Sequence, residues 1–373
     1  MDWMNLLIIL IEAVVMVLLV MTVAGYSVVA ERKVASWIQN RPGPNRATVP
    51  ILGDIPIAGR WLTRIGFFQL WADGAKFLFK QEPVPGHVNK VYYVLAPIMA
   101  FVPPLVVLSV IPFGQFVGIP CGQFADSVTK PLALTNMDVG ILFVMAISGL
   151  SVVGIIMAGW AANSKFPYFG SVRAAAQLIS YELTVGLSLL CVFLWTGGTL
   201  NIFEIVQHQG AVVGGGKFGL PLWNICIMPV AALMYLVAIF AECNRLPFDM
   251  MESETDLVGG FHTEYGAFKF GLFFVGEYAH MVVGALLFAL LFLGGWNIPF
   301  VSNELLPIGW LGAIVSVCIV AAKALCVQFL YMWVRWTLPR FRYDQVMNLG
   351  WKIFLPLGVA NLAVYAVILA FVA

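Results

Sequence analysis

Seven carboxylates are crowded into one short stretch of the chain. Of the 19 Asp and Glu residues in 373, seven fall between positions 242 and 277. They are Glu242, Asp249, Glu252, Glu254, Asp256, Glu264 and Glu277. Carboxylates are costly near a bilayer, and where they occur they tend to mark ion or substrate paths. We therefore expect the function of the chain to lie in this acidic stretch.

A polar stripe precedes it in the sequence. Gln69, Asp73, Lys76 and Lys80 recur at spacings of four, three and four, which places them on one face of a helix. The other face is apolar, and twelve residues are too few to span a membrane, so an amphipathic helix at the membrane surface is expected. The helix is either a plain surface anchor, or its stripe faces a buried cavity with Asp73 and Lys76 paired one turn apart.

Several charges lie inside or at the edge of apolar segments. Glu31 stands beside two cations at a membrane boundary, which suggests a fixed network, and Glu182 and Glu277 lie one to two turns inside apolar segments. A charge at the centre of a membrane helix costs on the order of 3 kcal/mol, so such groups must be paired, hydrated or protonated. Lys323, near the middle of another segment, fits a structural ion pair as well as a functional role.

The composition indicates the elements that must position these side chains. The chain is 61% hydrophobic and 10% charged, against about 25% charged for a soluble domain. This predicts an all-α polytopic membrane protein without a soluble domain. Eight apolar segments are long enough to span hydrocarbon, at 6–29, 94–113, 139–160, 178–195, 222–241, 270–293, 308–334 and 353–372.

Basic residues predict the orientation. Seventeen of the 20 Lys and Arg residues fall in the connections 31–93, 161–177, 242–269 and 335–352. The positive-inside rule places these connections in the cytoplasm, and eight spans then leave both termini on the outer side. We expect a single membrane domain over 1–373. Its cytoplasmic parts are the 31–93 connection, with the amphipathic helix, and the acidic connection 242–269.

Several kinds of site are excluded by spacing. The six cysteines show no C-x-x-C or Cys/His pattern, so we expect no metal or iron–sulfur ligation by this chain. A calcium loop fails because Leu257 stands where its glycine is needed, and no dinucleotide fingerprint is present. Two tasks remain: holding a long apolar ligand with a polar head, or passing protons between buried carboxylates.

Seven motifs together resemble one family. They are Glu31-Arg-Lys-Val, Arg41-Pro-Gly-Pro-Asn, Gln69-Leu-Trp-Ala-Asp-Gly-Ala-Lys, Asn163-Ser-Lys-Phe, Tyr181-Glu-Leu-Thr, Ala241-Glu-Cys-Asn-Arg-Leu-Pro-Phe-Asp and Pro339-Arg-Phe-Arg-Tyr-Asp-Gln. The chain resembles, over nearly its whole length, the quinone-site membrane subunits of proton-pumping NADH:quinone oxidoreductase, respiratory complex I. That family has bacterial and mitochondrial members.

The resemblance implies roles for particular residues. Those expected to line or support a quinone tunnel are Glu31, Arg32, Arg41, Asp73, Lys76, Asp249 and Phe274, with Arg340 and Arg342 at its mouth. An acidic proton path is expected from Glu182, Glu242, Glu252, Glu254, Asp256, Glu264 and Glu277. Asp256 stands where many relatives carry Glu, so its shorter reach leaves this role open.

The resemblance also implies partners and a location. The chain itself would hold no cofactor and would be inactive alone, with ubiquinone or another quinone as substrate. FMN and iron–sulfur clusters would lie in partner subunits, and further membrane-arm subunits would adjoin the chain. The expected location is the bacterial plasma membrane, with the mitochondrial inner membrane as the alternative.

Three other interpretations stay open from the sequence. The homologous subunit of a membrane-bound hydrogenase would share the fold. An autonomous transporter is disfavoured because no internal repeat is visible. A purely structural docking anchor would tolerate substitutions in the acidic run.

Overall fold

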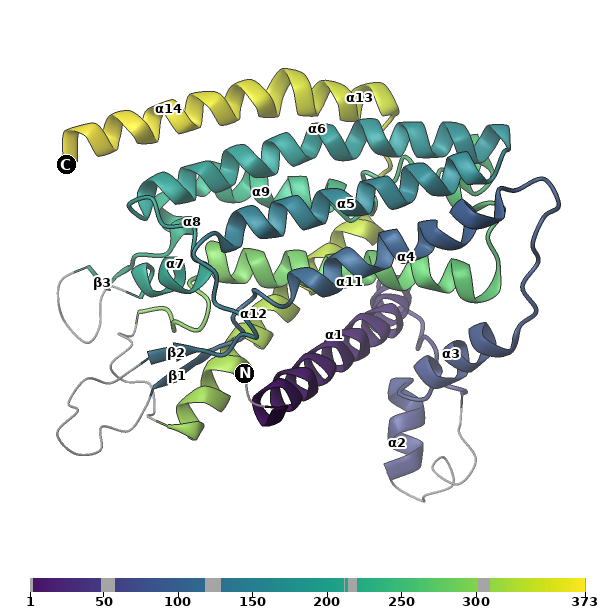
Figure 1. The fold of residues 1–373 in the computed structure, drawn as a ribbon, viewed down its shortest axis with the longest axis horizontal. Coiled ribbons are helices and arrows are strands. Elements are labelled where there is room, and N and C mark those ends of the chain that lie inside the picture. The colour runs from purple at the N-terminus through teal and green to yellow at the C-terminus, as the bar shows by residue number, and fades with distance from the viewer. Residues whose placement is uncertain are drawn as a thin grey trace.

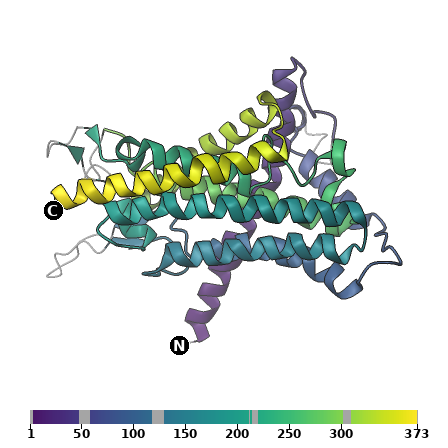
Figure 2. The same cartoon turned by 90° about the horizontal axis from the view of Figure 1, so that it is seen from above.

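The computed structural model describes residues 3–47, 58–117, 129–210, 212–213, 220–300 and 309–372. Several long helices lie roughly side by side along the long axis of the molecule, and others, among them the N-terminal helix, cross that axis at an angle (Figures 1 and 2). The longest are α1 (Trp3–Ile38), α4 (Lys90–Val107), α5 (Gly140–Ala161), α6 (Lys165–Trp195), α11 (Ala267–Leu291), α12 (Trp310–Thr337) and α14 (Leu355–Val372). The predicted helical membrane fold therefore holds for the described residues.

Seven helical segments of the described chain are long and apolar enough to cross a membrane, one fewer than predicted. The difference lies at 222–241, where the structure has two helices, α8 (Asn224–Ile227) and α9 (Pro229–Glu242). Pro229 has no N–H to donate and disfavours helical geometry at Met228, so the helix breaks there. The 14 residues of α9 rise about 21 Å, which is less than the thickness of the hydrocarbon core.

Three predicted boundaries also move, and the largest shift is at α6, which starts at Lys165, 13 residues before the predicted position 178. Helix α1 continues nine residues past the predicted end at position 29, because no helix breaker precedes Asn40 and Pro42. Glu31 and Arg32 therefore lie on a helix and not in a connection. At the other end of the chain, α13 (Tyr343–Asn348) and a π-helical turn (Leu349–Phe354) run directly into α14, so the last helix starts ten residues before the predicted position.

The helices pack around α11. It contacts α1, α4, α9 and α12, and 78% of the residues in its most hydrophobic 18-residue stretch are buried. By contrast, only 11% of the residues in the corresponding stretch of the last helical segment are buried. This segment contains α14, which lies on the outside of the bundle against α6 (Figure 1). Glu277 and Phe274 on α11 are thus held at the centre of the molecule.

The connections separate into two ends. One end, called here the acidic end, carries α2 (Ala58–Ile65), α3 (Gln69–Phe79), α10 (Glu254–Leu257), the 3-10 turn Gly260–His262 and α13 (Figure 1). The opposite end carries α7 (Ile202–His208) and two antiparallel strand pairs, β1 (Gln115–Val117) with β2 (Thr129–Pro131) and β3 (Val212–Val213) with β4 (Leu220–Pro221). The four basic connections thus share one end, as the charge distribution predicted.

Candidate functional site

A buried carboxylate on α1 anchors one network. The Glu31 side chain is only 6% exposed and forms an ion pair with Arg335 of α12. The Tyr278 hydroxyl on α11 donates a hydrogen bond of 2.5 Å to Glu31 Oε2. Three helices that are distant in sequence therefore meet at the Glu31 carboxylate, which is held by a network of fixed partners.

A second buried pair lies next to it. Arg245 Nη2 is 3.3 Å from Glu277 Oε2, and the two side chains are 4% and 10% exposed. The Arg245 guanidinium also lies 4.2 Å from the ring centre of Tyr278 and 5.5 Å from that of Phe274. A guanidinium over two aromatic faces is stabilised by their ring quadrupoles. Through Tyr278, the two buried pairs form one continuous contact chain.

The segment that carries Arg245 is fixed by Gln177 of α6. The Gln177 side-chain amide donates to the carbonyl oxygens of Ala241 at 2.9 Å and Phe248 at 2.8 Å. Gln177 is fully buried, so these bonds are shielded from water and hold both ends of the loop against α6.

Asp249 forms the third pair, at the edge of the acidic end. Its Oδ2 accepts a 2.8 Å hydrogen bond from Arg340, whose guanidinium also reaches Ser253 at 3.4 Å. Burial and the neighbouring Glu252 raise the pKa of Asp249 above its ordinary value, and Arg340 partly offsets that rise.

Cavities adjoin these charges at the surface of the acidic end. Arg32 pairs with Asp73 at 2.8 Å, and Gln69 donates to the same carboxylate at 3.0 Å. Asp73 thus pairs with Arg32 and not with Lys76, because the helical extension of α1 brings Arg32 to α3. Lys76 and Asp73 line a cavity of about 520 Å³, and Arg41 and Arg32 line another of about 640 Å³.

A larger apolar cavity of about 860 Å³ opens between α1, α12 and the turn after α2. Tyr26, Phe67, Phe329 and Met332 form much of its wall, and Lys33 contributes a charge. The wall also includes Ala30, the residue before Glu31. The cavity therefore suits a long apolar molecule whose polar end lies toward the buried charges.

The other predicted acidic residues are dispersed over the acidic end. Glu252 lies 3.6 Å from His262, Glu264 lies 3.8 Å from His87, and Asp256 lies 3.5 Å from Arg173. The side chain of Glu254 lies outside the described parts. Arg342 is exposed at the start of α13, where its backbone N–H bonds the Gln345 side chain at 3.0 Å.

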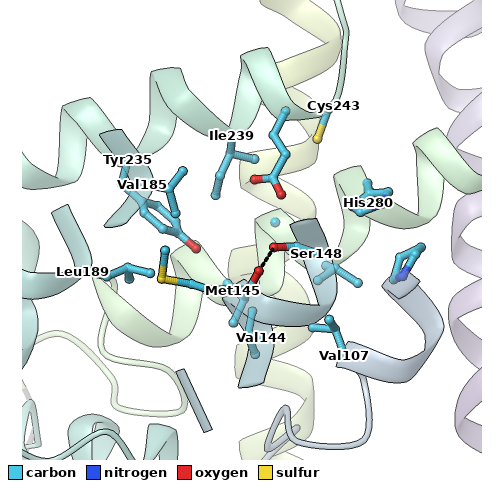
Figure 3. Close-up of a pocket in the computed structure, with 15 residues that line it drawn as sticks. Val107, Val144, Met145, Ser148, Val185, Leu189, Tyr235, Ile239, Cys243 and His280 are labelled. Carbon is cyan, nitrogen blue, oxygen red and sulfur yellow. Dashed lines mark hydrogen bonds between the residues drawn. The ribbon is translucent and has the colours of Figure 1, made fainter. Parts of the chain in front are cut away.

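Two predicted carboxylates lie deeper in the bundle. Glu242 ends α9 and lines a small cavity together with Ser148, Tyr235 and Cys243 (Figure 3). The Ser148 hydroxyl donates to the Met145 carbonyl oxygen at 3.0 Å and lines this cavity with Glu242 (Figure 3). Glu182 of α6 packs against Gly149 of α5, the residue next to Ser148. The structure therefore brings Glu182, Glu242 and Glu277 into the same interior region.

Sequence reasoning missed Arg245, Arg335 and Tyr278. Arg245 stands in the acidic run, and the need to neutralise Glu277 was a signal for a buried cation. Arg335 closes α12 as a basic end residue does in many membrane helices, so nothing local distinguished it. Within the described parts, no three His, Cys, Asp or Glu side chains gather as metal ligands.

Comparisons with known proteins match one family over nearly the whole chain. A family model described as NADH dehydrogenase matches residues 11–366. The chain is 42% identical to the H subunit of NADH-quinone oxidoreductase from Leptospira biflexa over 363 residues, 96% of this chain and 94% of that protein. It is 41% identical to an H subunit of the same enzyme from Geobacter metallireducens (92% and 91% covered) and 39% identical to NADH-quinone oxidoreductase subunit 8 of Rhodothermus marinus (92% of each).

Proposed function

The chain belongs to the NADH dehydrogenase family, and from this premise we propose that it forms the quinone-binding tunnel of an NADH:quinone oxidoreductase and the acidic path that couples quinone reduction to proton translocation. The relatives named above are bacterial subunits of that enzyme. We place this chain likewise, as a membrane subunit in a bacterial plasma membrane, with flavin and iron–sulfur clusters in partner subunits.

One observation carries the proposal. Glu31, Tyr278, Arg245 and Glu277 form an unbroken series of contacts that leads from the side of the apolar cavity to the centre of the bundle. A quinone tail occupies the apolar cavity, and its head lies toward the charged residues and the partner subunits. Reduction of a quinone to a quinol consumes two electrons, from the partner clusters, and two protons.

The buried pairs can transmit this event. A change of charge near Glu31 or Asp249 alters the field at Arg245, because such fields are weakly screened away from water. Arg245 neutralises Glu277, so a shift of the guanidinium toward new negative charge favours protonation of that carboxylate. Glu277, Glu242 and Glu182 then pass the effect further into the membrane domain.

Neutral variants of the acidic path test this function. In the complete enzyme in its native membrane, Glu277→Gln and Glu252→Gln are expected to lower quinone reduction and proton pumping severalfold. Oxidation of NADH by an artificial acceptor that bypasses quinone should stay at the wild-type level. Glu82→Gln, which removes a partly exposed carboxylate paired with Lys269, is the matched control and should change neither activity.

One outcome would contradict the proposal, and another would assign the effect to assembly. Unchanged quinone reduction and pumping in both acidic-path variants would leave the carboxylates as structural features. An equal loss of the bypass activity would mean that the substitutions prevent assembly.

Co-purification tests the placement in a complex. The chain, tagged at its C-terminus and extracted in mild detergent, should bring down flavin, iron–sulfur signals and inhibitor-sensitive NADH:quinone reductase. Recovery of clusters without flavin would instead indicate a hydrogenase-like assembly.

A further inference from the structure

Two small cavities lie inside the bundle and share two polar side chains. The larger, about 40 Å³, is lined by Ser148, Tyr235, Cys243, Glu242 and His280, with apolar groups around them (Figure 3). The smaller, about 20 Å³, is lined by polar groups of Ser151, Asn244 and Glu277, and again by Glu242 and His280. Glu242 and His280 are the residues that line both.

The size and the lining of these cavities suit water. A buried water needs about 10–15 Å³ and two to four polar partners, and genuinely dry cavities are apolar. Each of the two cavities exceeds that volume and offers carboxyl, imidazole and hydroxyl or amide groups. Both can therefore hold at least one hydrogen-bonded water.

His280 has hydrogen-bonding capacity that the described protein leaves unused. Its Nε2 atom is buried and has no hydrogen-bond partner there, whereas Glu277 Oε2 has Arg245 as its ionic partner but accepts no hydrogen bond. Buried polar atoms without a partner are unfavourable, so in folded proteins they are almost always hydrogen-bonded to protein groups or to ordered water. Water in the adjoining cavities can supply the partner that His280 lacks and can donate a hydrogen bond to the Glu277 carboxylate as well.

The position of His280 on α11 fixes its connections. Glu277 and His280 are three residues apart, which places them on the same face of the helix. From Met281 to Leu291 every side chain of α11 is apolar, so no polar route continues along this helix beyond His280. Glu242, at the end of α9, is the carboxylate that shares both cavities with His280.

We propose that His280 is the polar junction that connects Glu277 to Glu242 through water held in these two cavities. This inference rests on the proposed function and adds a positioning residue to the acidic path. The imidazole holds the water between the two carboxyl groups by hydrogen bonding, so a neutral polar side chain of similar reach can replace it.

Paired substitutions at one position test the junction. His280→Asn keeps a donor and an acceptor, whereas His280→Met fills the space with an adaptable apolar side chain. In the complete enzyme, His280→Met should reduce quinone-linked proton pumping by about tenfold, the effect of one strong hydrogen-bonded contact. His280→Asn should retain at least about half of it, and His208→Leu, at the opposite end of the bundle, is the control for loss of a histidine.

The other wall of the smaller cavity gives a second measurement. Ser151→Ala removes a hydroxyl from that wall with little change in packing, and should lower pumping in the same direction. This variant decides the question if His280→Met does not assemble, as judged from NADH oxidation by the bypass acceptor.

Three results would overturn the junction. Full pumping in His280→Met would exclude it, equal loss in His280→Asn and His280→Met would assign the effect to packing, and unchanged pumping in Ser151→Ala would remove the water path. Glu277→Gln, measured alongside, separates the two proposals. If it lowers pumping while His280→Met and Ser151→Ala do not, the acidic path stands without this junction.

Discussion

At the scale of single residues, the buried charges are neutralised by partners from distant parts of the chain. Glu31 meets Arg335, Arg245 meets Glu277, and Asp249 meets Arg340. Removing one member of such a pair leaves an uncompensated buried charge and costs about 3–5 kcal/mol, whereas the intact pair adds little to stability. The pairs therefore serve to fix positions and fields around the candidate site.

The Asp249–Arg340 pair predicts a pH effect. The pKa of Asp249 is already raised by burial and by Glu252, and Arg340 counteracts the rise. Arg340→Gln removes that counteraction, so the pKa of Asp249 rises further. As the pH is lowered, the carboxylate then becomes protonated at a higher pH than it does with Arg340 in place. The acid limb of quinone reductase activity should therefore move up by about one pH unit, within the usual effect of an adjacent charge.

A pH profile of the complete enzyme measures this shift. Lys352→Gln removes an exposed cation from the same end of the bundle and should leave the profile unchanged. An acid limb that stayed in place in Arg340→Gln would show that ionised Asp249 is not required in turnover.

Residue roles were only partly predictable from the sequence. Glu31 was identified because a carboxylate beside two cations at a membrane boundary demands a partner. The partner itself, Arg335, lies 304 positions along the chain, and no local pattern joins the two. The same reason explains why local spacing paired Asp73 with Lys76, while the folded chain brings Arg32 to Asp73.

At the scale of elements, close helix packing places the interior carboxylates. A Cβ added at Gly149 of α5 would lie 2.9 Å from Glu182 Oε1, closer than real Cβ atoms approach other groups. Glycine thus lets α6 bring its carboxylate against α5 beside Ser148. A side chain at position 149 would therefore have to push aside the Glu182 carboxylate, the flexible end of that side chain.

Gly149→Ala should therefore displace the Glu182 carboxylate and lower proton pumping severalfold, while the bypass activity is kept. Gly271→Ala on α11 is the matched control, since a Cβ there meets Phe77 at 3.6 Å or more, an ordinary contact distance. Equal effects of the two substitutions would show that glycine itself, and not room for Glu182, matters at position 149.

Lys323 acts at the end of α11 that faces away from the acidic end. Its ammonium group donates to the carbonyl oxygens of Leu293, Gly295 and Asn297 at 2.6–2.7 Å, and lies 4.2 Å from the Trp223 ring centre. The side-chain amides of Gln209 and Asn224 bond the Leu290 and Leu291 carbonyls in the same turn. Helix α11 thus ends in a cap built from other elements, where its terminal carbonyls need partners.

Lys323→Met should destabilise this cap by about 3 kcal/mol or more, because three buried carbonyls lose a charged donor. The midpoint of thermal unfolding of the purified complex measures the loss, and Lys130→Met, an exposed lysine at the same end, is the control. Unchanged stability together with lost pumping would instead make Lys323 a functional group.

The helices themselves were largely predictable, and the departures have local causes. Long apolar runs predicted α4, α5, α11 and α12, and the four-three-four spacing predicted α3. The break before Pro229 and the extension of α1 to Ile38 were missed, since apolar length alone reports neither a helix breaker nor its absence.

At the scale of the whole molecule, charge separates the two ends. The connections that hold most of the lysine and arginine residues also include the acidic stretch, and they lie together at the acidic end. The strand pairs and the C-terminus lie at the other end (Figure 1). Although α9 is short, it leads from α8 to the acidic connection, so the chain passes between the two ends at this point as well. Both termini are then expected on the same side of the membrane, opposite the acidic end.

Accessibility of introduced thiols tests that arrangement. In a chain whose Cys121 and exposed Cys226, Cys318 and Cys326 are changed to serine, Lys130→Cys should react with a membrane-impermeant reagent in intact cells. Val84→Cys, at the acidic end, should react only after the membrane is opened. A cysteine added after residue 373 should behave like Lys130→Cys if α9 completes a crossing. If the added cysteine is labelled only in opened cells while Lys130→Cys is labelled in intact ones, the chain crosses the membrane an odd number of times between residue 130 and the C-terminus. The positive-inside rule places the basic connections in the cytoplasm but does not fix the number of crossings.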